Sequence, residues 1–572
     1  MKVINYNSHF HLEAILPTTG FSALIRRHRR GFSALAVAAL IVAVLIAVPI
    51  VSVGANLLLG GSADTWNHLA STVLPDYIVN TLILCAGVGF GVVLVGVSTA
   101  WLVSIHDFPG RRVFEWALVL PLAVPAYVMA YAYTDLLQFV GPVQSALREA
   151  FGWRGGQYWF PDVRTVGGAV AVFVFVLYPY VYLLARAAFL ERASGILEVG
   201  RSLGLGPWEN FWRISLPLAR PAIAAGAALA LMETLADFGA VSYFGVPTFT
   251  SGIYRAWFSM GDRVAAAQLA AMLLGFVALV LFLEKATRGR ARFNNTTGRH
   301  RPMPGYRLHG IKAFGAMLAC IVPLALGFLV PAGVLLHMAI TEGDAQFGER
   351  FLHLARNSFV LALATAFAAV VVAVLLAYAA RISGKLAPRI ANRIVGLGYA
   401  VPGSVIAVGI LIPVTRLDTW IAGMVETYTG HNPGLLLTGG IAALVYAYLV
   451  RFLAVSLQTV EASLAKITPT MDDAARSLGF GHGETLVRIH LPLLRGSLLT
   501  AGLLVFVDVM KELPATLVMR PFNFDTLATQ AYTLASDERL AEASTAALTI
   551  VAVGVLPLII ISWQIARSRN GR

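Results

Sequence analysis

Uninterrupted apolar runs of twenty or more residues recur along the whole of this chain. A helix needs about 20 apolar residues to cross a bilayer core of about 30 Å, so each run is long enough to span a membrane. Of the 572 residues, 58% are hydrophobic and only 13% are charged, whereas soluble domains carry about twice that charge. A transmembrane β-barrel would need alternating apolar and polar residues instead. The sequence therefore predicts an all-α polytopic membrane protein.

The predicted spans form two sets of six, and the second set repeats the first. Asn80 aligns with Asn357, and Val124-Pro125 aligns with Val401-Pro402, both with a shift of 277 residues. An even number of spans in each half makes the repeats parallel, related by a pseudo-twofold axis along the membrane normal. The first set covers residues 32–58, 79–103, 113–137, 166–190, 220–246 and 264–285, and the second covers 312–337, 356–381, 392–416, 434–460, 495–518 and 541–566.

These spans predict two homologous halves joined by a basic linker. The predicted parts are an N-terminal segment at 1–31, a first half at 32–285 with a polar loop at 191–219, a linker at 286–311, a second half at 312–566 with a polar loop at 461–494, and a tail at 567–572. The first apolar run is too long for a signal-peptide core, so we expect it to be retained as a span. Cys85 and Cys320 lie inside apolar runs, and no disulfide or metal-binding pattern is visible.

Basic residues predict the orientation of the chain. The stretch "KATRGRARFNNTTGRHRPMPGYRLHGIK", residues 285–312, has eight Lys or Arg and no acid, whereas the loop at 59–78 has no Lys or Arg. By the positive-inside rule, both termini, the linker and both polar loops lie in the cytoplasm. Despite the net charge of +13, we interpret the linker as an orientation signal beside anionic lipid and not as a nucleic-acid site. In this assignment, Lys511 is the one Lys or Arg placed within a span.

A polar segment occurs twice between apolar runs. Residues 201–220 read "RSLGLGPWENFWRISLPLAR", and residues 476–495 read "RSLGFGHGETLVRIHLPLLR". In each copy a Gly is expected to close a short helix, because Gly adopts the left-handed conformation readily. Glu209 with Arg213, and Glu484 with Arg488, are then spaced i, i+4 on a second helical segment. A Leu-Pro pair is expected to turn the chain into the next span.

This doubled segment resembles the coupling loop of ABC-importer permeases, written E-A-A, three residues, G, nine residues, I, one residue, L-P. The second copy reads "DAARSLGFGHGETLVRIHLP" and the first reads "EVGRSLGLGPWENFWRISLP". The resemblance implies that each loop binds a groove of a cytoplasmic ABC ATPase dimer. No G-x-x-x-x-G-K-[ST] occurs here, so ATP is expected on that partner and no cofactor on this chain. The implied coupling residues are Glu198, Arg201, Gly204, Pro217, Asp473, Arg476, Gly479 and Pro492.

Charged residues inside spans are costly and are usually functional. The fifth span of each half carries them at matched positions, since Glu233 aligns with Asp508 and Asp237 with Glu512, and Lys511 lies beside the second pair. Each i, i+4 pair is expected to share one helix face. Four carboxylates near the axis would suit a hard cation, with Lys511 neutralising one carboxylate when the path is empty. A lock between helices, a place at the membrane interface, and a gate are the alternatives.

Six tyrosines are further candidate ligands, although packing or interfacial anchoring also explains them. They are Tyr127, Tyr131, Tyr133, Tyr178, Tyr180 and Tyr182.

The segments "ETLADFGAVSYFGVPTFTSGIYRAWF" and "KELPATLVMRPFNFDTLATQAY" resemble the fused ferric-iron importer permeases. That resemblance implies a bacterial inner-membrane permease for ferric iron, supplied by a binding protein outside the membrane. Thiamine, aminophosphonate and polyamine permeases are related alternatives. A secondary transporter also has duplicated halves, but it does not need two ATPase-docking loops. A membrane enzyme is disfavoured, because neither H-E-x-x-H nor G-x-S-x-G is present.

Overall fold

The computed structural model describes residues 34–56, 63–202, 204, 206–288, 306–341, 348–383 and 386–570. Within these residues the chain is almost entirely helical, and its one sheet pairs two parallel strands, β1 (His106–Asp107) and β2 (Tyr306–Arg307). The predicted N-terminal segment at 1–31 and most of the linker at 286–311 lie outside the described residues.

In the described part of the chain, eleven helices are long and apolar enough to cross a membrane, and one bent pair makes a twelfth span. This confirms the predicted fold class, an all-α membrane protein with two six-helix halves. The spans of the first half are α2 (Ala34–Asn56), α4 (Leu74–Ile105), α5 (Arg111–Ala117) with η1 (Leu120–Ala123) and α6 (Ala126–Leu137), α8 (Val166–Ser202), α10 (Leu216–Ala236) and α13 (Arg263–Arg288). Those of the second half are α14 (Gly310–Leu324) with η4 (Ala325–Leu329) and α15 (Val330–Thr341), α16 (Glu349–Ser383), α17 (Leu386–Leu397) with η6 (Gly398–Ala400) and α18 (Gly403–Thr429), α19 (Ala442–Leu464), α22 (Leu491–Met510) and α25 (Leu540–Asn570).

Short helices join the spans. Those of the first half are α3 (Ala63–Thr72), α7 (Pro142–Phe151), α9 (Pro207–Asn210), η2 (Phe211–Ser215), α11 (Gly239–Tyr243), α12 (Phe249–Tyr254) and η3 (Arg255–Ser259). Those of the second half are α20 (Pro469–Ser477), α21 (His482–Thr485), η7 (Leu486–His490), α23 (Pro514–Met519) and α24 (Leu527–Ser536). Of these, α9, η2, α11 and α12 of the first half correspond to α21, η7, α23 and α24 of the second.

The matched Val-Pro pairs break the third span of each half. Pro125 has φ −61° and ψ 143°, and Pro402 has φ −57° and ψ 143°, so both adopt an extended conformation between a 3₁₀ turn and the following helix. Proline disfavours the helical conformation in the residue before it, and Val124 and Val401 are accordingly extended. In the first half the two helical pieces are bent by 91°.

The aligned asparagines form matched hydrogen bonds. The side-chain amide of Asn80 on α4 donates to the carbonyl of Pro247 at 2.9 Å, ahead of α12. Asn357 on α16 donates to the carbonyl of Asp525 at 3.1 Å, ahead of α24. The repeat that is visible in the sequence therefore extends to individual contacts.

The leading helix of each half packs against the other half. The hydroxyl of Tyr446 on α19 donates to the carbonyl of Leu45 on α2 at 2.5 Å, and Tyr133 on α6 donates to the carbonyl of Leu326 in η4 at 2.6 Å. A Cβ on Gly409 of α18 would lie 2.4 Å from the carbonyl oxygen of Pro49 on α2, so only glycine permits this approach. The sequence repeat therefore does not correspond to two separate bundles.

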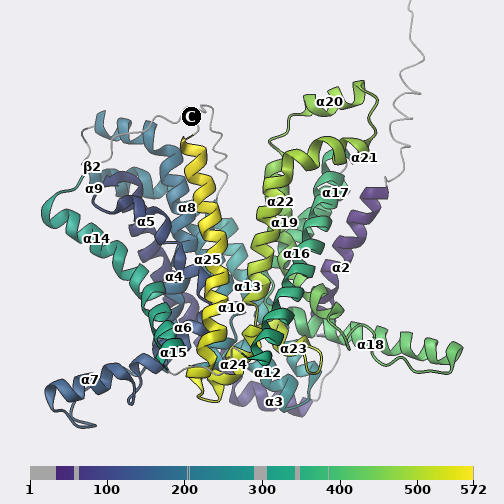
Figure 1. Cartoon of the computed structure of the whole chain (residues 1–572), viewed down its shortest axis with the longest axis horizontal. Helices are drawn as coiled ribbons and strands as arrows, with labels where there is room; N and C mark the ends of the chain where they lie inside the picture. Colours follow the sequence, from purple (N-terminus) through teal and green to yellow (C-terminus); the bar gives the residue numbers. More distant parts are fainter. Residues whose placement is uncertain are drawn as a thin grey trace, which may run out of the picture.

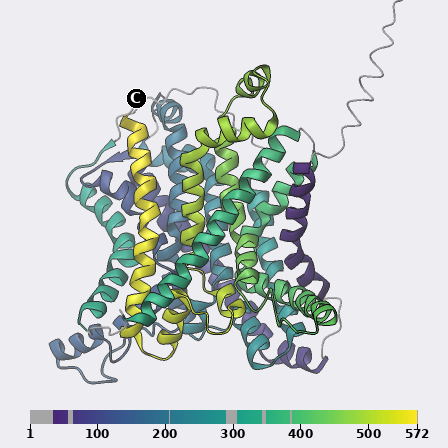
Figure 2. The ribbon, with the colours of Figure 1, turned by 45° about the vertical axis from the view of Figure 1, so that its right-hand side comes forward.

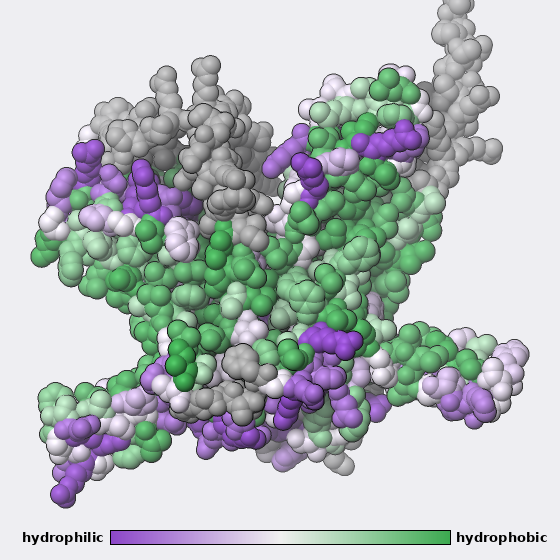
Figure 3. Space-filling model, viewed as in Figure 1, coloured by the Kyte–Doolittle hydropathy of each residue, from purple (hydrophilic) through white to green (hydrophobic). Residues whose placement is uncertain are grey.

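The two groups of spans diverge toward the end that carries α20 and meet at the end that carries α3 (Figure 1). We call these ends the loop side and the far side. The view turned by 45° shows the same two ends (Figure 2). A broad hydrophobic surface covers the spans, and hydrophilic residues gather at both ends (Figure 3), as expected for a protein that crosses a bilayer.

The predicted orientation is testable with single cysteines at exposed positions. Ser71 lies on α3 at the far side and Ser477 on α20 at the loop side, and both side chains are exposed. In a Cys85→Ser, Cys320→Ser background, a membrane-impermeant maleimide added outside the cell is expected to label Ser71→Cys and not Ser477→Cys. After permeabilisation, both variants should react. Labelling of Ser477→Cys alone in intact cells would show that the orientation is the reverse of the predicted one.

Candidate functional site

The second polar loop begins with α20, whose end is closed by Gly479. Gly479 has φ +84°. Its N–H donates to the carbonyl of Arg476 at 3.0 Å, and the N–H of Phe480 donates to the carbonyl of Ala475 at 3.0 Å. This pair of bonds is a Schellman motif, which satisfies the last carbonyls of a helix when glycine takes the left-handed conformation. In the first copy Gly204 also has positive φ, +73°.

The first loop departs from the predicted plan. Its expected short helix is the last part of α8, which continues without a break from Val166 to Ser202. In the second half, α19 ends at Leu464 and α20 begins at Pro469. A proline in the first turn of α20 favours a new helix start, and the first copy has no proline at that place. The side chains of Glu198 and Arg201 lie outside the described residues.

A π-helical turn precedes the Leu-Pro pair in both copies. The N–H of Leu216 donates to the carbonyl of Phe211, and the N–H of Leu491 donates to the carbonyl of Leu486. Helical structure nevertheless continues through both prolines, from Trp208 to Ala236 and from His482 to Met510, so neither Pro217 nor Pro492 interrupts the helix that enters the next span. Proline is tolerated in the first turn of a helical segment, where its missing N–H has no partner to lose.

The second loop presents charged and apolar side chains on its exposed surface. Asp473 pairs with Arg476, and each side chain is 63% exposed. Glu484 lies 3.6 Å from Arg488, as its i, i+4 spacing predicts. Met471, Leu478 and Val487 are exposed apolar residues on the same loop. Such a mixed surface of apolar and paired charged groups is typical of a protein interface.

The interior side of this loop is fixed to the spans by residues that the sequence analysis did not select. Asp472 accepts hydrogen bonds from Arg381 of α16 at 2.9 Å and pairs with His490 at 2.8 Å. Arg381 also donates to the carbonyls of Leu464 and Ile467. Asp472 directly precedes the motif residue Asp473, and the motif does not tell which of these two neighbouring aspartates contacts the spans. Asp472 therefore connects α20 to α16 and to η7.

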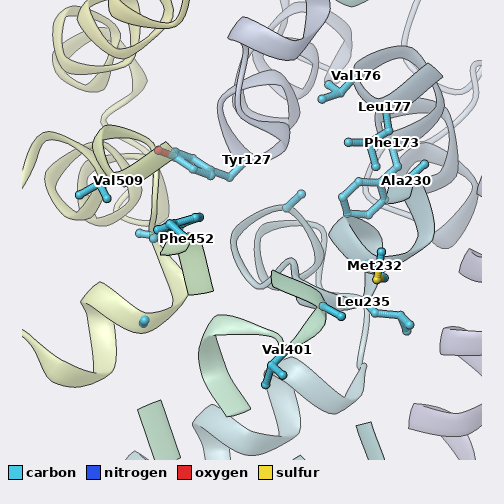
Figure 4. Packing of buried hydrophobic residues seen from close by; sticks show 14 of the residues in the cluster. Tyr127, Phe173, Val176, Leu177, Ala230, Met232, Leu235, Val401, Phe452 and Val509 are labelled. Carbon is cyan, nitrogen blue, oxygen red and sulfur yellow. The ribbon is translucent and has the colours of Figure 1, made fainter. Parts of the chain in front are cut away.

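A cavity of about 110 Å³ lies between the two halves, at the ends of the fifth spans. All five predicted in-span residues line it: Glu233, Asp237, Asp508, Lys511 and Glu512. The structure therefore brings together groups that lie 275 residues apart in the sequence. Apolar residues that form part of its wall, including Tyr127, Phe173 and Phe452, are seen in Figure 4.

The carboxylates of this cavity pair with two cations, one of which was missed. The guanidinium of Arg451 on α19 lies 3.4 Å from Glu233 and 3.3 Å from Glu512. Lys511 lies 2.9 Å from Asp508. The expectation that Lys511 is the one Lys or Arg within a span is wrong, because Arg186 and Arg451 lie inside candidate spans, whereas Lys511 directly follows the span that ends at Met510.

Asp237 and Glu512 do not share a helix face with their partners, because α10 ends at Ala236 and α22 at Met510. The fifth spans thus end before the predicted 246 and 518. Asp237 accepts from the backbone N–H groups of Ala240 and Val241. Glu512 accepts from those of Ala515 and Thr516 at 3.1 and 3.2 Å. Each carboxylate therefore caps the short helix that follows, where unpaired N–H groups favour negative charge.

The six tyrosines serve different purposes. Tyr127 and Tyr180 line the cavity, whereas Tyr131, Tyr178 and Tyr182 are fully buried among core residues, and Tyr133 bonds Leu326. Tyr399, which was not selected, also lines the cavity. Among the residues that the structure describes, no group of three or more His, Cys, Asp or Glu is arranged to hold a metal ion.

Comparisons with known proteins relate the chain to transport permeases. The family described as "Binding-protein-dependent transport system inner membrane component" matches residues 91–292. The chain is 27% identical to the Fe(3+)-transport system permease protein FbpB 2 of Haemophilus influenzae, covering 85% of this chain and 90% of that protein. It is 22% identical to the putative ferric transport system permease protein FbpB 1 of the same organism, covering 79% and 71%. It is 29% identical to the molybdenum transport system permease protein ModB of Escherichia coli, covering 34% and 87%.

Residues 91–292 are a domain of this family, and the chain is a permease of the binding-protein-dependent ABC importers. It is a multi-pass protein of the inner membrane. More particularly, it is a fused permease, with both halves in one chain, and it is similar over most of its length to the two permeases named for ferric transport.

Proposed function

We propose that this permease imports ferric iron, received from a binding protein outside the membrane, through the cavity lined by Glu233, Asp237, Asp508, Lys511 and Glu512. The observation that carries the proposal is the convergence of four carboxylates from both halves on one cavity. Carboxylate oxygen is the ligand type that hard cations prefer.

The charge of the cavity favours a cation over an oxyanion. Its four carboxylates and two cations, Arg451 and Lys511, give a formal charge of −4 + 2 = −2. Permeases named for sulfate and molybdenum transport also match parts of this chain. A negative cavity in a region of low dielectric constant would repel their oxyanions, so it supports cationic cargo.

Energy for transport is proposed to come from a separate ABC ATPase dimer that binds the loops at 191–219 and 461–494. The exposed residues Met471, Leu478 and Val487 and the neighbouring ion pairs supply a contact surface in the second loop. Trp212 occupies the position of Val487 in the first loop and is also exposed. The contacts of Asp472 with Arg381 and His490 connect that surface to the spans.

The test is uptake of radioactive ferric iron by proteoliposomes that contain the permease, its ATPase and its binding protein. Uptake is expected to require ATP on the side of the membrane that the two loops face. It should be insensitive to a protonophore. A secondary transporter would show the opposite pattern, with uptake that follows an ion gradient. Absence of iron uptake, together with ATP-dependent uptake of labelled thiamine or polyamine by the same proteoliposomes, would assign the cargo to one of the related substrates.

A further inference from the structure

We propose that Arg451 is an internal cation that occupies the carboxylate site when no cargo is present, and that a multivalent cation enters the site by displacing it. This inference rests on the proposed cation path. It adds to that path a residue that neither the family comparisons nor the repeat pattern selects.

The guanidinium of Arg451 joins carboxylates from the two halves. One terminal nitrogen lies 3.4 Å from Glu233, on α10 of the first half, and the other lies 3.3 Å from Glu512, at the end of the fifth span of the second half. The side chain of Arg451 is 8% exposed and that of Glu512 is 2% exposed. Arg451 therefore holds the two halves together at the place where the cavity lies.

The two ion pairs are longer than the strongest pairs of this type. Charge-assisted N–H···O bonds are commonly about 2.7–2.9 Å long, and both contacts of Arg451 exceed that range. Its Nε is buried and has no hydrogen-bond partner within the described residues. The guanidinium thus offsets part of the negative charge of the site without forming its best contacts, so a cation with higher charge is able to compete for the same oxygens.

The charge of Arg451 has no counterpart in the first half. With the shift of 275 residues that aligns the fifth spans, Arg451 corresponds to Val176 and Lys511 corresponds to Ala236, and both apolar residues line the same cavity. A permease built from two identical subunits would present either two such arginines or none. The fused chain carries a single one, which bridges both halves while the remaining charge of the site stays negative.

A purely structural ion pair would have a different consequence from an internal cation. Removing one partner of a buried structural pair leaves an unpaired charge and destabilises the protein. If Arg451 instead occupies a cation site, its removal leaves Glu233 and Glu512 open to an external cation, which then restores the neutral state. Cation binding to the empty permease therefore distinguishes the two roles.

The experiment measures binding of Tb³⁺, a hard trivalent probe, to the full chain in lipid nanodiscs by luminescence titration. Arg451→Gln is expected to bind one Tb³⁺ at least about tenfold more tightly than the wild type, since a nearby positive charge has been removed. Adding Glu233→Gln to Arg451→Gln should remove the gain. The matched control is Arg186→Gln, which removes another in-span arginine, paired with Glu115 at 3.1 Å, and should leave Tb³⁺ affinity unchanged.

Arg451→Lys provides a second measurement if Arg451→Gln is not recovered as a folded protein. A lysine bonds as a compact point charge and lacks the planar fork that reaches two carboxylates, so its Tb³⁺ affinity should exceed that of the wild type by about threefold. Folded Arg451→Gln or Arg451→Lys with wild-type Tb³⁺ affinity would overturn the proposal. An equal gain in Arg186→Gln would also overturn it. Loss of iron uptake is not part of this readout, so a Tb³⁺ gain in a permease that imports no iron would reject the substrate and retain the internal cation.

Discussion

Replacing Gly479 with proline is expected to lower ATP-driven transport by about tenfold or more while the protein still inserts into the membrane. Gly479 has φ +84°, whereas proline is restricted to a φ of about −65°. Proline also removes the N–H that bonds the carbonyl of Arg476. The end of α20 therefore has to rearrange, and the exposed surface that includes Leu478 is displaced. Gly204→Pro should act in the same way in the first loop.

The measurement is binding-protein-stimulated ATP hydrolysis, together with uptake, in proteoliposomes that contain the assembled transporter. Gly483→Ala is the matched control, because Gly483 lies in the same loop on α21 and a Cβ there meets nothing within 4 Å. That variant should retain wild-type activity. If Gly479→Pro and Gly204→Pro both keep full stimulation and uptake, the two loops do not couple this permease to its ATPase.

The double substitution Glu233→Gln with Asp508→Asn is expected to lower ferric uptake by about tenfold or more and to change assembly with the ATPase much less. The two residues occupy matched positions in the halves and line one cavity. Two unit charges about 4 Å apart interact by about 4 kcal/mol at an effective dielectric constant of about 20, so removing two negative charges beside a cation exceeds the roughly 1.4 kcal/mol that corresponds to a tenfold effect. The amides preserve the size of both side chains.

Uptake of radioactive iron and the yield of the permease–ATPase complex are measured on the same preparation. Glu115→Gln is the control, because Glu115 forms a half-buried ion pair with Arg186 on α8, away from the cavity. If Glu233 and Asp508 have a structural role, the yield of the permease–ATPase complex should fall more than uptake per assembled complex. That fall should be at least as large as in Glu115→Gln. Unchanged uptake in a well-assembled double variant would exclude both residues from the path.

The polar loops show how far a motif leads toward a structure. The spacing of "RSLG" predicted the glycine that closes α20, because a left-handed residue at the end of a helix is a local requirement. It did not predict that the first copy extends α8, or that Asp472 and not Asp473 faces Arg381. Those features depend on what packs against each loop, and neighbours in space are not encoded by the spacing of a motif.

A similar distinction holds for contacts that occupy equivalent places in the two halves. Arg186 pairs with Glu115 at 3.1 Å in the first half, and Asn392 donates to Glu461 at 2.6 Å in the second. Glu461 aligns with Arg186 and Asn392 with Glu115, at shifts of 275 and 277. The two halves therefore keep a contact between equivalent positions but form it with different side chains. Residue identity alone therefore hides this relation, which appears only when the helices are placed beside one another.

The sequence by itself determined the class of fold, the duplication, the paired loops and the fifth-span charges, because long apolar runs and matched residues are properties of the chain read in order. Only the tertiary structure decided that each leading helix packs against the opposite half, that Asp237 and Glu512 cap the helices after the fifth spans, and that Arg451 joins Glu233 to Glu512. The physical reason is that an ion pair inside a membrane protein depends on which helix faces meet, and segments that are distant in the sequence can supply those faces. Arg451 and Glu233, for example, are 218 residues apart.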